Sequence, residues 1–337
     1  MSNLFKKAIV FTDIHFGLKS NSIKHNQDCE HFIDWVIQHG LANDCETCLF
    51  LGDWHHHRAS INLQTLNYSL RSLEKLNAAF ENIFFIPGNH DLYYRDKRDV
   101  HGVEFAKHLP NVTIVNDWFK RGDVSIVPWL VGEEYKQLPR IKAKYMFGHF
   151  ELPHFKLNSL IEMPDHGTIQ TEQLGGVEKV FSGHFHLRQT RGNITYIGNA
   201  FPHNFSDAGD DKRGCMILEW DKEPEFHAWP DQPLYVVTTL SQLLDNGENI
   251  LKPKMCVRVH LDISVSYEEA IFIKDTFHSK FDLREISLIS TKNTEHENDN
   301  LEELSFNSVD KIISEQICAI ESDYFKPALL MEIYNAL

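Results

Sequence analysis

The feature that most constrains this chain is a repeated order of short apolar runs, each followed at once by a polar cluster. The runs have the length and apolar character of buried strands. Glycines at the junctions allow the backbone to turn sharply where a strand ends. Because polar side chains at the ends of strands gather at one edge of such sheets, we expect the clusters to form one site. The five clusters are Asp13-Ile14-His15, Gly52-Asp53, Gly88-Asn89-His90-Asp91, Gly148-His149 and Gly183-His184-Phe185-His186.

The segments between the clusters predict a chain that alternates strands and helices in its first half. Helical spacing of apolar residues runs from Cys29 to Ile37 and again through Leu63, Leu66, Leu70, Leu73 and Leu76. Strands are expected at 8–12, 47–51, 83–86, 112–115, 125–127, 144–147, 178–181, 194–197 and 216–220. The predicted fold is of the α+β or α/β class, with two stacked mixed β-sheets flanked by helices.

A change of composition near Glu223 predicts a second domain. Prolines at 224, 230 and 233 break the chain there, and strands are expected at 235–238, 256–261 and 286–289 around a helix at 267–281. We therefore expect a main domain at 1–222 and a small α/β domain at 223–290. Residues 291–304 are polar and mostly acidic, which is typical of a linker. Residues 305–337 regain helical periodicity in two apolar stripes and predict a helical tail.

Composition limits the class of protein. Hydrophobic residues make up 42% and charged residues 24%, as in ordinary globular chains. Apolar runs fall short of the roughly 18 residues that span a bilayer, and the N-terminus differs from a cleavable signal. We expect a cytoplasmic protein. The net charge of −15 argues against coating nucleic acid by bulk attraction, but it leaves room for a local basic track.

Asp, Asn and His in the clusters are donors that suit a pair of divalent cations. Carboxylate and amide oxygens favour Mn or Mg, and imidazole favours Fe, Mn or Zn. Two cations about 3.5–4 Å apart can clamp the attacking and leaving oxygens of a phosphoryl displacement. Asp53 is the candidate for the carboxylate that bridges them. One Asp or His at a strand end is more often a turn residue, so it is the combination that favours a metal site.

The order and identity of the clusters, over about residues 8–200, resemble the calcineurin-like metallophosphoesterases. The resemblance implies two divalent ions, with Mn expected and Mg, Fe or Zn as alternatives. It implies that His90 protonates the leaving oxygen or steadies the charge of the phosphate, and that Asp91 orients His90. The implied ligands are Asp13, His15, Asp53 and His186 for one metal, and Asp53, Asn89, His149 and His184 for the other.

The surroundings of the clusters are similar to SbcD-type nuclease subunits of the double-strand-break repair complex, and among them to the recombination endonuclease subunits of T-even phages. The similarity rests on His56, on the stretch from Tyr196 to Ala200 that leads to Lys212-Arg213-Gly214, and on the small domain and tail. It implies an Mn-dependent DNA exonuclease or endonuclease that hydrolyses phosphodiesters by metal-activated water. It also implies a homodimer, in which the helix that begins near Leu63 is the dimerisation candidate, although core packing explains the same stripe.

The same resemblance assigns roles to the remaining parts. His56 would help to place the DNA strand, the small domain would cap the site and grip DNA, and the tail would dock on a coiled-coil ATPase of the SbcC type. Double-stranded ends and single strands are the expected substrates. The residues after Asp91, Leu92-Tyr93-Tyr94-Arg95, depart from the Ser-Pro sequence of bacterial members. Candidates for contact with the DNA backbone are Arg58, Arg95, Lys97, Arg98, Arg188, Arg191, Lys212 and Arg213.

Two other functions fit parts of the same pattern. A stand-alone phosphatase or nucleotide phosphodiesterase of the superfamily would use the same metals, and its tail would pack on its own domain. A catalytically silent scaffold would use the fold to tether an ATPase and DNA, but the complete set of expected ligands argues against it. DNA cleavage in the presence of Mn distinguishes the three hypotheses.

Overall fold

The computed structural model describes residues 3–157 and 161–290 of the 337-residue chain. The chain divides into two compact units, Met1–Leu234 and a second that begins at Tyr235. Among the described helices, none combines the length and the apolar character needed to cross a membrane.

The first sheet of the large unit has six strands, and its central strands carry the first three polar clusters at their ends. Strands β1 to β4 are parallel neighbours, whereas β11 and β12 complete one side in antiparallel pairing. In spatial order the strands are β12 (Glu225–Ala228), β11 (Gly214–Glu219), β1 (Lys7–Phe11), β2 (Thr47–Phe50), β3 (Asn82–Phe85) and β4 (Val112–Ile114).

The second sheet also combines four parallel strands with two antiparallel ones, but it places the antiparallel strands at opposite edges. Its four central strands are parallel, and an antiparallel strand closes each edge. Because the carboxyl ends of parallel strands meet at one edge, the plan places the loops that follow them together. In spatial order the strands are β5 (Phe119–Arg121), β6 (Val124–Ile126), β7 (Ala143–His149), β8 (Val177–Gly183), β10 (Ile194–Tyr196) and β9 (Gln189–Arg191).

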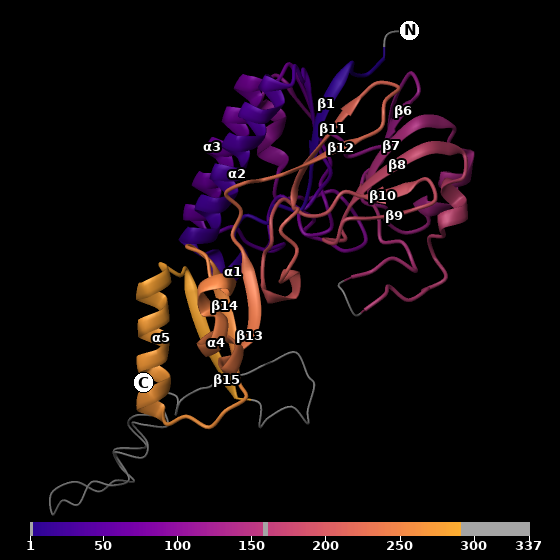
Figure 1. The fold of residues 1–337 in the computed structure, drawn as a ribbon. Helices are drawn as coiled ribbons and strands as arrows, with labels where there is room; N and C mark the ends of the chain where they lie inside the picture. The colour runs from indigo at the N-terminus through magenta and orange to yellow at the C-terminus, as the bar shows by residue number, and fades with distance from the viewer. Residues whose placement is uncertain (1–2, 158–160, 291–337) are drawn as a thin grey trace, which may run out of the picture. The chain divides into compact units, whose positions relative to one another are not determined.

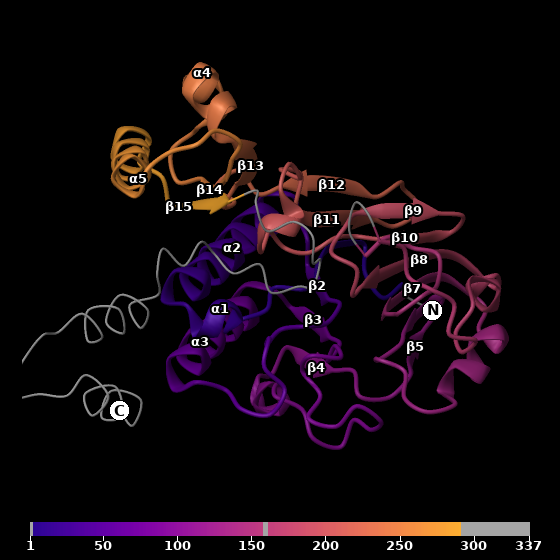
Figure 2. The same ribbon diagram turned by 90° about the horizontal axis from the view of Figure 1, so that it is seen from below.

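Two long helices cover one face of the first sheet, and the second sheet lies against the other face (Figure 1). They are α2 (Ile23–Ala42) and α3 (Leu63–Ala79), preceded by the single turn α1 (Leu18–Asn21). Figure 2 shows the same layering from below. Successive side chains of β1 point to opposite faces of the sheet and so enter two different cores. Ile9 and Phe11 pack against the helices, while Ala8 and Val10 pack between the sheets.

A third core lies on the outer face of the second sheet, where 3-10 helices and loops cover it. Leu138 and Leu174 contribute to this core. The helices that carry them are η2 (Glu134–Arg140) and η3 (Thr171–Leu174), and the remaining 3-10 helices of the unit are η1 (Glu104–His108) and η4 (Phe205–Asp207).

The second unit is a small parallel sheet with one helix in each crossover. Its order is β13 (Tyr235–Thr239), α4 (Leu240–Ile250), β14 (Cys256–Leu261), α5 (Tyr267–Phe281) and β15 (Glu285–Ser290). Both helices begin with a capping box, in which the side chains of Thr239 and Ser266 accept from the backbone of the third helical residue. The linker expected at 291–304 and the tail expected at 305–337 lie outside the described residues.

The predicted fold class of two stacked mixed sheets flanked by helices is confirmed. The boundary between the domains was placed too early, at 222/223. Residues 225–228 form β12, which pairs with β11 and so belongs to the first sheet, and the second unit begins at Tyr235. The cause is that Pro224 and Pro230 flank an edge strand of the large sheet, where prolines are tolerated.

The leucine stripe expected on α3 is only partly buried. Leu73 and Leu76 are in the core, but Leu63 is 77% exposed. The buried face of the helix includes polar residues instead, among them Ser69, whose hydroxyl accepts a hydrogen bond from Trp54 Nε1 at 2.7 Å. The stripe therefore leaves the core at the N-terminal end of the helix.

We predict that Leu73→Ala lowers the free energy of unfolding by about 2–5 kcal/mol, because it removes a fully buried side chain and leaves a cavity. Glu74→Ala, at the exposed neighbouring position, is the matched control and should change it by less than about 0.5 kcal/mol. Urea denaturation followed by circular dichroism measures both. Equal losses for the two variants would contradict the assignment of the buried face.

Candidate metal centre

The five polar clusters meet where the parallel strands of the two sheets end. Asp13 and His15 follow β1, and Asp53 follows β2. The two loops continue side by side after the strands, because the Asp13 N–H donates to Gly52 O at 2.9 Å and the His15 N–H donates to Asp53 O at 3.1 Å. The other clusters follow in the same way: Asn89 and His90 after β3, His149 at the end of β7, and His184 and His186 after β8.

Asp53 lies between histidine side chains that come from the first sheet and from the second. Its Oδ2 is 3.5 Å from His149 Nε2 of the second sheet and 3.7 Å from His15 Nε2 of the first. Its Oδ1 accepts from the His90 N–H at 2.8 Å. Burial alone would raise the pKa of Asp53, but the imidazole of His149 holds it well below its ordinary value. Asp53 is therefore an anion surrounded by nitrogen atoms.

The first group of candidate ligands contains Asp13, His15 and Asp53, with His186 beside them. His15 Nε2 is 3.9 Å from Asp13 Oδ1, and His186 Nε2 is 4.0 Å from the same oxygen. Donor atoms of Asp13, His15 and Asp53 all lie within 4.8 Å of one another. Burial lowers the pKa of His15 well below its ordinary value, so its imidazole is neutral at pH 7. A neutral imidazole is the form that binds a metal.

Two atoms of the first group indicate what it could hold. Asp13 Oδ2 accepts from the Thr12 hydroxyl at 2.7 Å and from the His184 N–H at 3.0 Å. In contrast, Asp13 Oδ1 and His15 Nε2 are buried without a hydrogen-bond partner among the described residues. Buried acceptors are costly when nothing satisfies them, and a cation between them would do so. The residues of this group therefore fit a metal ion.

The second group consists of Asp53, Asn89, His149 and His184. Asn89 Oδ1 lies 3.0 Å from His149 Nε2 and 3.1 Å from His184 Nδ1. Donor atoms of Asp53, His149 and His184 lie within 4.8 Å of one another. Burial lowers the pKa of His149, but the Asp53 carboxylate outweighs this effect and raises it to about 9.

Outer contacts hold the imidazoles of the second group in defined orientations. His149 Nδ1 donates to Leu51 O at 2.6 Å, and His184 Nε2 lies 3.4 Å from Glu151 Oε2. The other ring nitrogens, His149 Nε2 and His184 Nδ1, both face Asn89 Oδ1. Such second hydrogen bonds fix the tautomer of a histidine ligand. Glu151 was not predicted as a site residue, although its position two residues after His149 offered a signal.

The backbone around the site adopts conformations that side chains other than glycine usually avoid. Four candidate ligands have positive φ angles: 50° at Asp13, 53° at His15, 61° at Asp53 and 90° at His184. Left-handed backbone at such residues costs about 1–3 kcal/mol each and is concentrated at functional sites. The strain therefore marks these four positions as more than ordinary turns.

Glycines at the strand ends make room for the ligands. A Cβ on Gly52, where φ is 109°, would run into the His149 ring, and a Cβ on Gly88 would run into the backbone and carboxylate of Asp53. A Cβ on Gly183 would meet the Thr12 hydroxyl. These three glycines let strands of both sheets approach the same carboxylate.

His90 is held by His56 rather than by Asp91. Its Nδ1 is 2.8 Å from the His56 carbonyl oxygen, and the His56 ring stacks on it with centroids 5.2 Å apart. The expected orienting role of Asp91 was wrong. The Asp91 carboxylate is buried and accepts from the backbone N–H groups of Trp54, His55 and Gly88, at 3.1, 2.8 and 2.9 Å. It therefore ties the loops that follow β2 and β3 together.

The basic residues expected near DNA differ in their exposure and in the partners that they already have. Arg213 is 2% exposed and occupied by buried partners, and Arg98 is paired with Glu134, so neither is available to a phosphate and both expectations are corrected. Arg188 is half-buried, and its guanidinium donates to the carbonyls of Ile197 and Lys212. The side chains that reach the surface, at least in part, are those of Arg58, Arg95, Lys97, Arg191 and Lys212.

A pocket of about 210 Å³ opens beside the second group, and sequence patterns gave no signal for it. Trp129 and Tyr135 line it together with His149 and Glu151. The Trp129 ring lies 5.7 Å from the ring of His149 and 5.2 Å from that of His184. Trp129 follows β6 in a loop whose composition resembles any other loop, so only the fold places it at the site.

We predict that Gly88→Ala weakens Mn binding about 10- to 100-fold, the range seen when groups that orient a metal ligand are lost, because the new methyl group displaces Asp53. Gly175→Ala is the control, since Gly175 has φ of −64° and lies outside the clusters. Calorimetric titration of Mn into both variants measures the change. Unaltered binding in Gly88→Ala would show that Asp53 does not contact the ion.

The chain resembles a curated protein and a solved structure. Among curated proteins, exonuclease subunit 1 of Enterobacteria phage T4 is 25% identical over 226 residues, which are 64% of this chain and 66% of that protein. The match thus spans just under two thirds of the relative's length. A solved structure of a Pseudomonas putida nuclease, MPE, shares 17% identity with a TM-score of 0.30, covering 56% of this chain and 66% of that one.

No family model matches the chain. The resemblance to phage nuclease subunits that the surroundings of the polar clusters predicted is confirmed by the sequence match: the chain is similar to an exonuclease subunit of phage T4.

Proposed function

We propose that this chain is a two-metal nuclease that hydrolyses the phosphodiester bonds of DNA. The observation that carries the proposal is the position of Asp53, which belongs to both groups of candidate ligands. One carboxylate shared by two donor sets is what a pair of divalent ions needs in order to act on one phosphate. Similarity to a phage exonuclease subunit supports a nucleic-acid substrate over a small phosphomonoester.

The proposed ligands are the seven side chains of the two groups. Asp13, His15, Asp53 and His186 would hold one ion, and Asp53, Asn89, His149 and His184 the other. Mixed oxygen and imidazole donors suit Mn, with Mg, Fe and Zn as alternatives. The ions would supply positive charge to the phosphate and lower the pKa of the attacking water.

His90 is proposed as the group that protonates the leaving oxygen. Because its Nδ1 is engaged by the His56 carbonyl at 2.8 Å, Nε2 is the nitrogen that can hold the transferable proton. Its ring is 4.9 Å from that of His15 by centroid, which places it beside the first group. His56 would steady His90 by stacking and would help to place the DNA strand.

Surface arginines beside the site are proposed to contact the DNA backbone. Burial and the neighbouring Arg95 lower the pKa of Arg58, while the charge of Asp53 opposes them, so Arg58 lies within electrostatic reach of both. Arg191 and Lys212 are exposed on the second sheet and its following loop.

The aromatic pocket lined by Trp129 and Tyr135 would receive a base by stacking, which does not depend on the base sequence of the DNA.

We further propose that the chain works as a homodimer and with a coiled-coil ATPase of the SbcC type. The exposed Leu63 at the start of α3 offers an apolar contact for a second copy. The apolar stripes of residues 305–337 favour a docking role for the tail, and the small domain would contribute to the grip on DNA. These assignments rest on the resemblance and on the sequence pattern.

With Mn present, the wild-type chain should cleave duplex and single-stranded DNA, and His90→Asn should lower kcat about 10²- to 10⁴-fold with metal binding retained. His57→Asn is the matched control, because His57 is exposed, adjacent to His56 and outside both groups. Gel assays on labelled DNA and calorimetric titration of Mn provide the two measurements.

Rapid hydrolysis of small phosphomonoesters without cleavage of DNA would reject the nuclease and favour a phosphatase. A His90→Asn protein that cuts at the normal rate would leave the metal site standing and remove His90 as the acid.

For the partner, we expect the full chain to co-sediment with the ATPase and a chain ending at Ser290 to lose this association while still binding Mn. Sedimentation velocity measures the complex with the ATPase. The same measurement on the Leu63→Asp variant alone tests the homodimer. Retention of the ATPase by the shortened chain would remove the docking role of the tail.

A further inference from the structure

A third histidine joins the first group of ligands from a loop that none of the five motifs contains. His203 follows β10, and ring nitrogens of His15, His186 and His203 lie within 4.8 Å of one another. The His203 ring centroid is 5.4 Å from that of His15 and 5.3 Å from that of His186. We propose that His203 is an additional ligand of the first metal ion, an inference that rests on the two-metal function proposed above.

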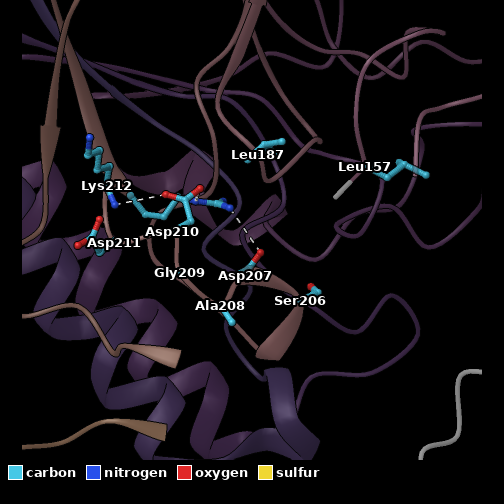
Figure 3. A pocket seen from close by; sticks show the side chains of 10 residues that line it. Leu157, Leu187, Ser206, Asp207, Ala208, Gly209, Asp210, Asp211 and Lys212 are labelled. Carbon is cyan, nitrogen blue, oxygen red and sulfur yellow. Dashed lines mark hydrogen bonds and ion pairs between the residues drawn. The ribbon is translucent and has the colours of Figure 1, made fainter. Parts of the chain in front are cut away.

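The position of His203 is built into the backbone. Its N–H donates to Asp207 Oδ2 at 2.8 Å, and the other oxygen of Asp207 is 3.5 Å from Arg213 Nη2. Figure 3 shows Asp207 and Asp210 on the same loop, at the edge of a pocket of about 390 Å³. The loop that carries His203 is therefore fixed by buried charges.

Arg213 connects this loop to the motif histidine. Its Nη1 donates to the His186 carbonyl oxygen and to Asn199 Oδ1, and its Nε donates to Asp210 Oδ2 at 2.7 Å. One buried guanidinium thus sets the backbone next to both His186 and His203.

The chemistry around His203 separates metal binding from simple packing. The side chain is 1% exposed and faces the rings of His15, His25 and His186 as well as that of Phe201. An apolar residue would fill such a space at lower cost, whereas several neutral imidazoles side by side are a typical donor set for a transition metal.

The consequence is a difference between the two ions. The first would have three imidazoles, from His15, His186 and His203, and the second two, from His149 and His184. Imidazole favours the later divalent metals, such as Co and Zn, over Mn and Mg. His203 should therefore make the first ion the one that discriminates among metals.

Titration of Co²⁺ and Mn²⁺ into the intact chain tests the proposal, by calorimetry and by the visible absorption of bound Co²⁺. His203→Ala and His203→Gln should weaken Co²⁺ at one of the two sites at least tenfold, weaken Mn²⁺ less, and leave the other site unchanged. His101→Ala is the matched control, because His101 is also buried but is paired with Glu104 and belongs to none of the ligand groups.

A second measurement observes the imidazole in the unsubstituted protein and uses a variant only to assign the signal. In the Co²⁺ form of the wild type labelled with ¹⁵N-histidine, the ring signals of His203 should show the large paramagnetic shift of a bound imidazole, assigned by their loss in His203→Gln. Unchanged Co²⁺ and Mn²⁺ affinities, or an unshifted His203 ring, would overturn this inference and leave the nuclease proposal intact. A wild type that binds neither ion would overturn both.

Discussion

The site depends on one buried carboxylate, that of Asp53, which both sheets surround. A carboxylate taken out of water must be compensated, and here the compensation comes from His149 and His15 and from the His90 N–H. These partners follow three different strands of two sheets. The order of the strands, the glycines at their ends and the positive φ angles of the ligands all serve to bring these groups to one carboxylate.

Most strands of the large unit could be predicted from the sequence, because buried parallel strands are short continuous apolar runs. The predicted strands at 8–12, 47–51 and 83–86 correspond to β1, β2 and β3 within one residue at each end. The strands that escaped prediction are edge strands, β5, β9 and β12, which are short and largely polar because one side faces water. Helix α4 was missed because it is short and its backbone departs from helical geometry at Asn246.

Position relative to the strands also explains which residues of the site could be predicted from the sequence. Residues directly after strands, such as Asp13 and His149, have positions that strand order alone predicts. Glu151, Trp129 and His203 lie in loops whose course depends on tertiary packing, so their sequence gave little or no indication. Charge misled at Arg98 and Arg213, because an arginine that is buried or paired with a carboxylate has the same local sequence as an exposed one. The role of Asp91 was misjudged for a related reason, since backbone N–H groups leave no trace in the sequence.

The core between the two sheets has a consequence beyond stability. Its side chains, among them Val10, Leu49 and Phe147, set the thickness of the layer that separates β1 and β2 from β7 and β8. Since Asp53 belongs to one layer and His149 to the other, this apolar filling acts as a spacer that sets how far the donor atoms of one sheet lie from those of the other. A change of side-chain volume in this core therefore shifts the two sets of donor atoms relative to one another, and evolution has there a means of adjusting the site without altering a single donor.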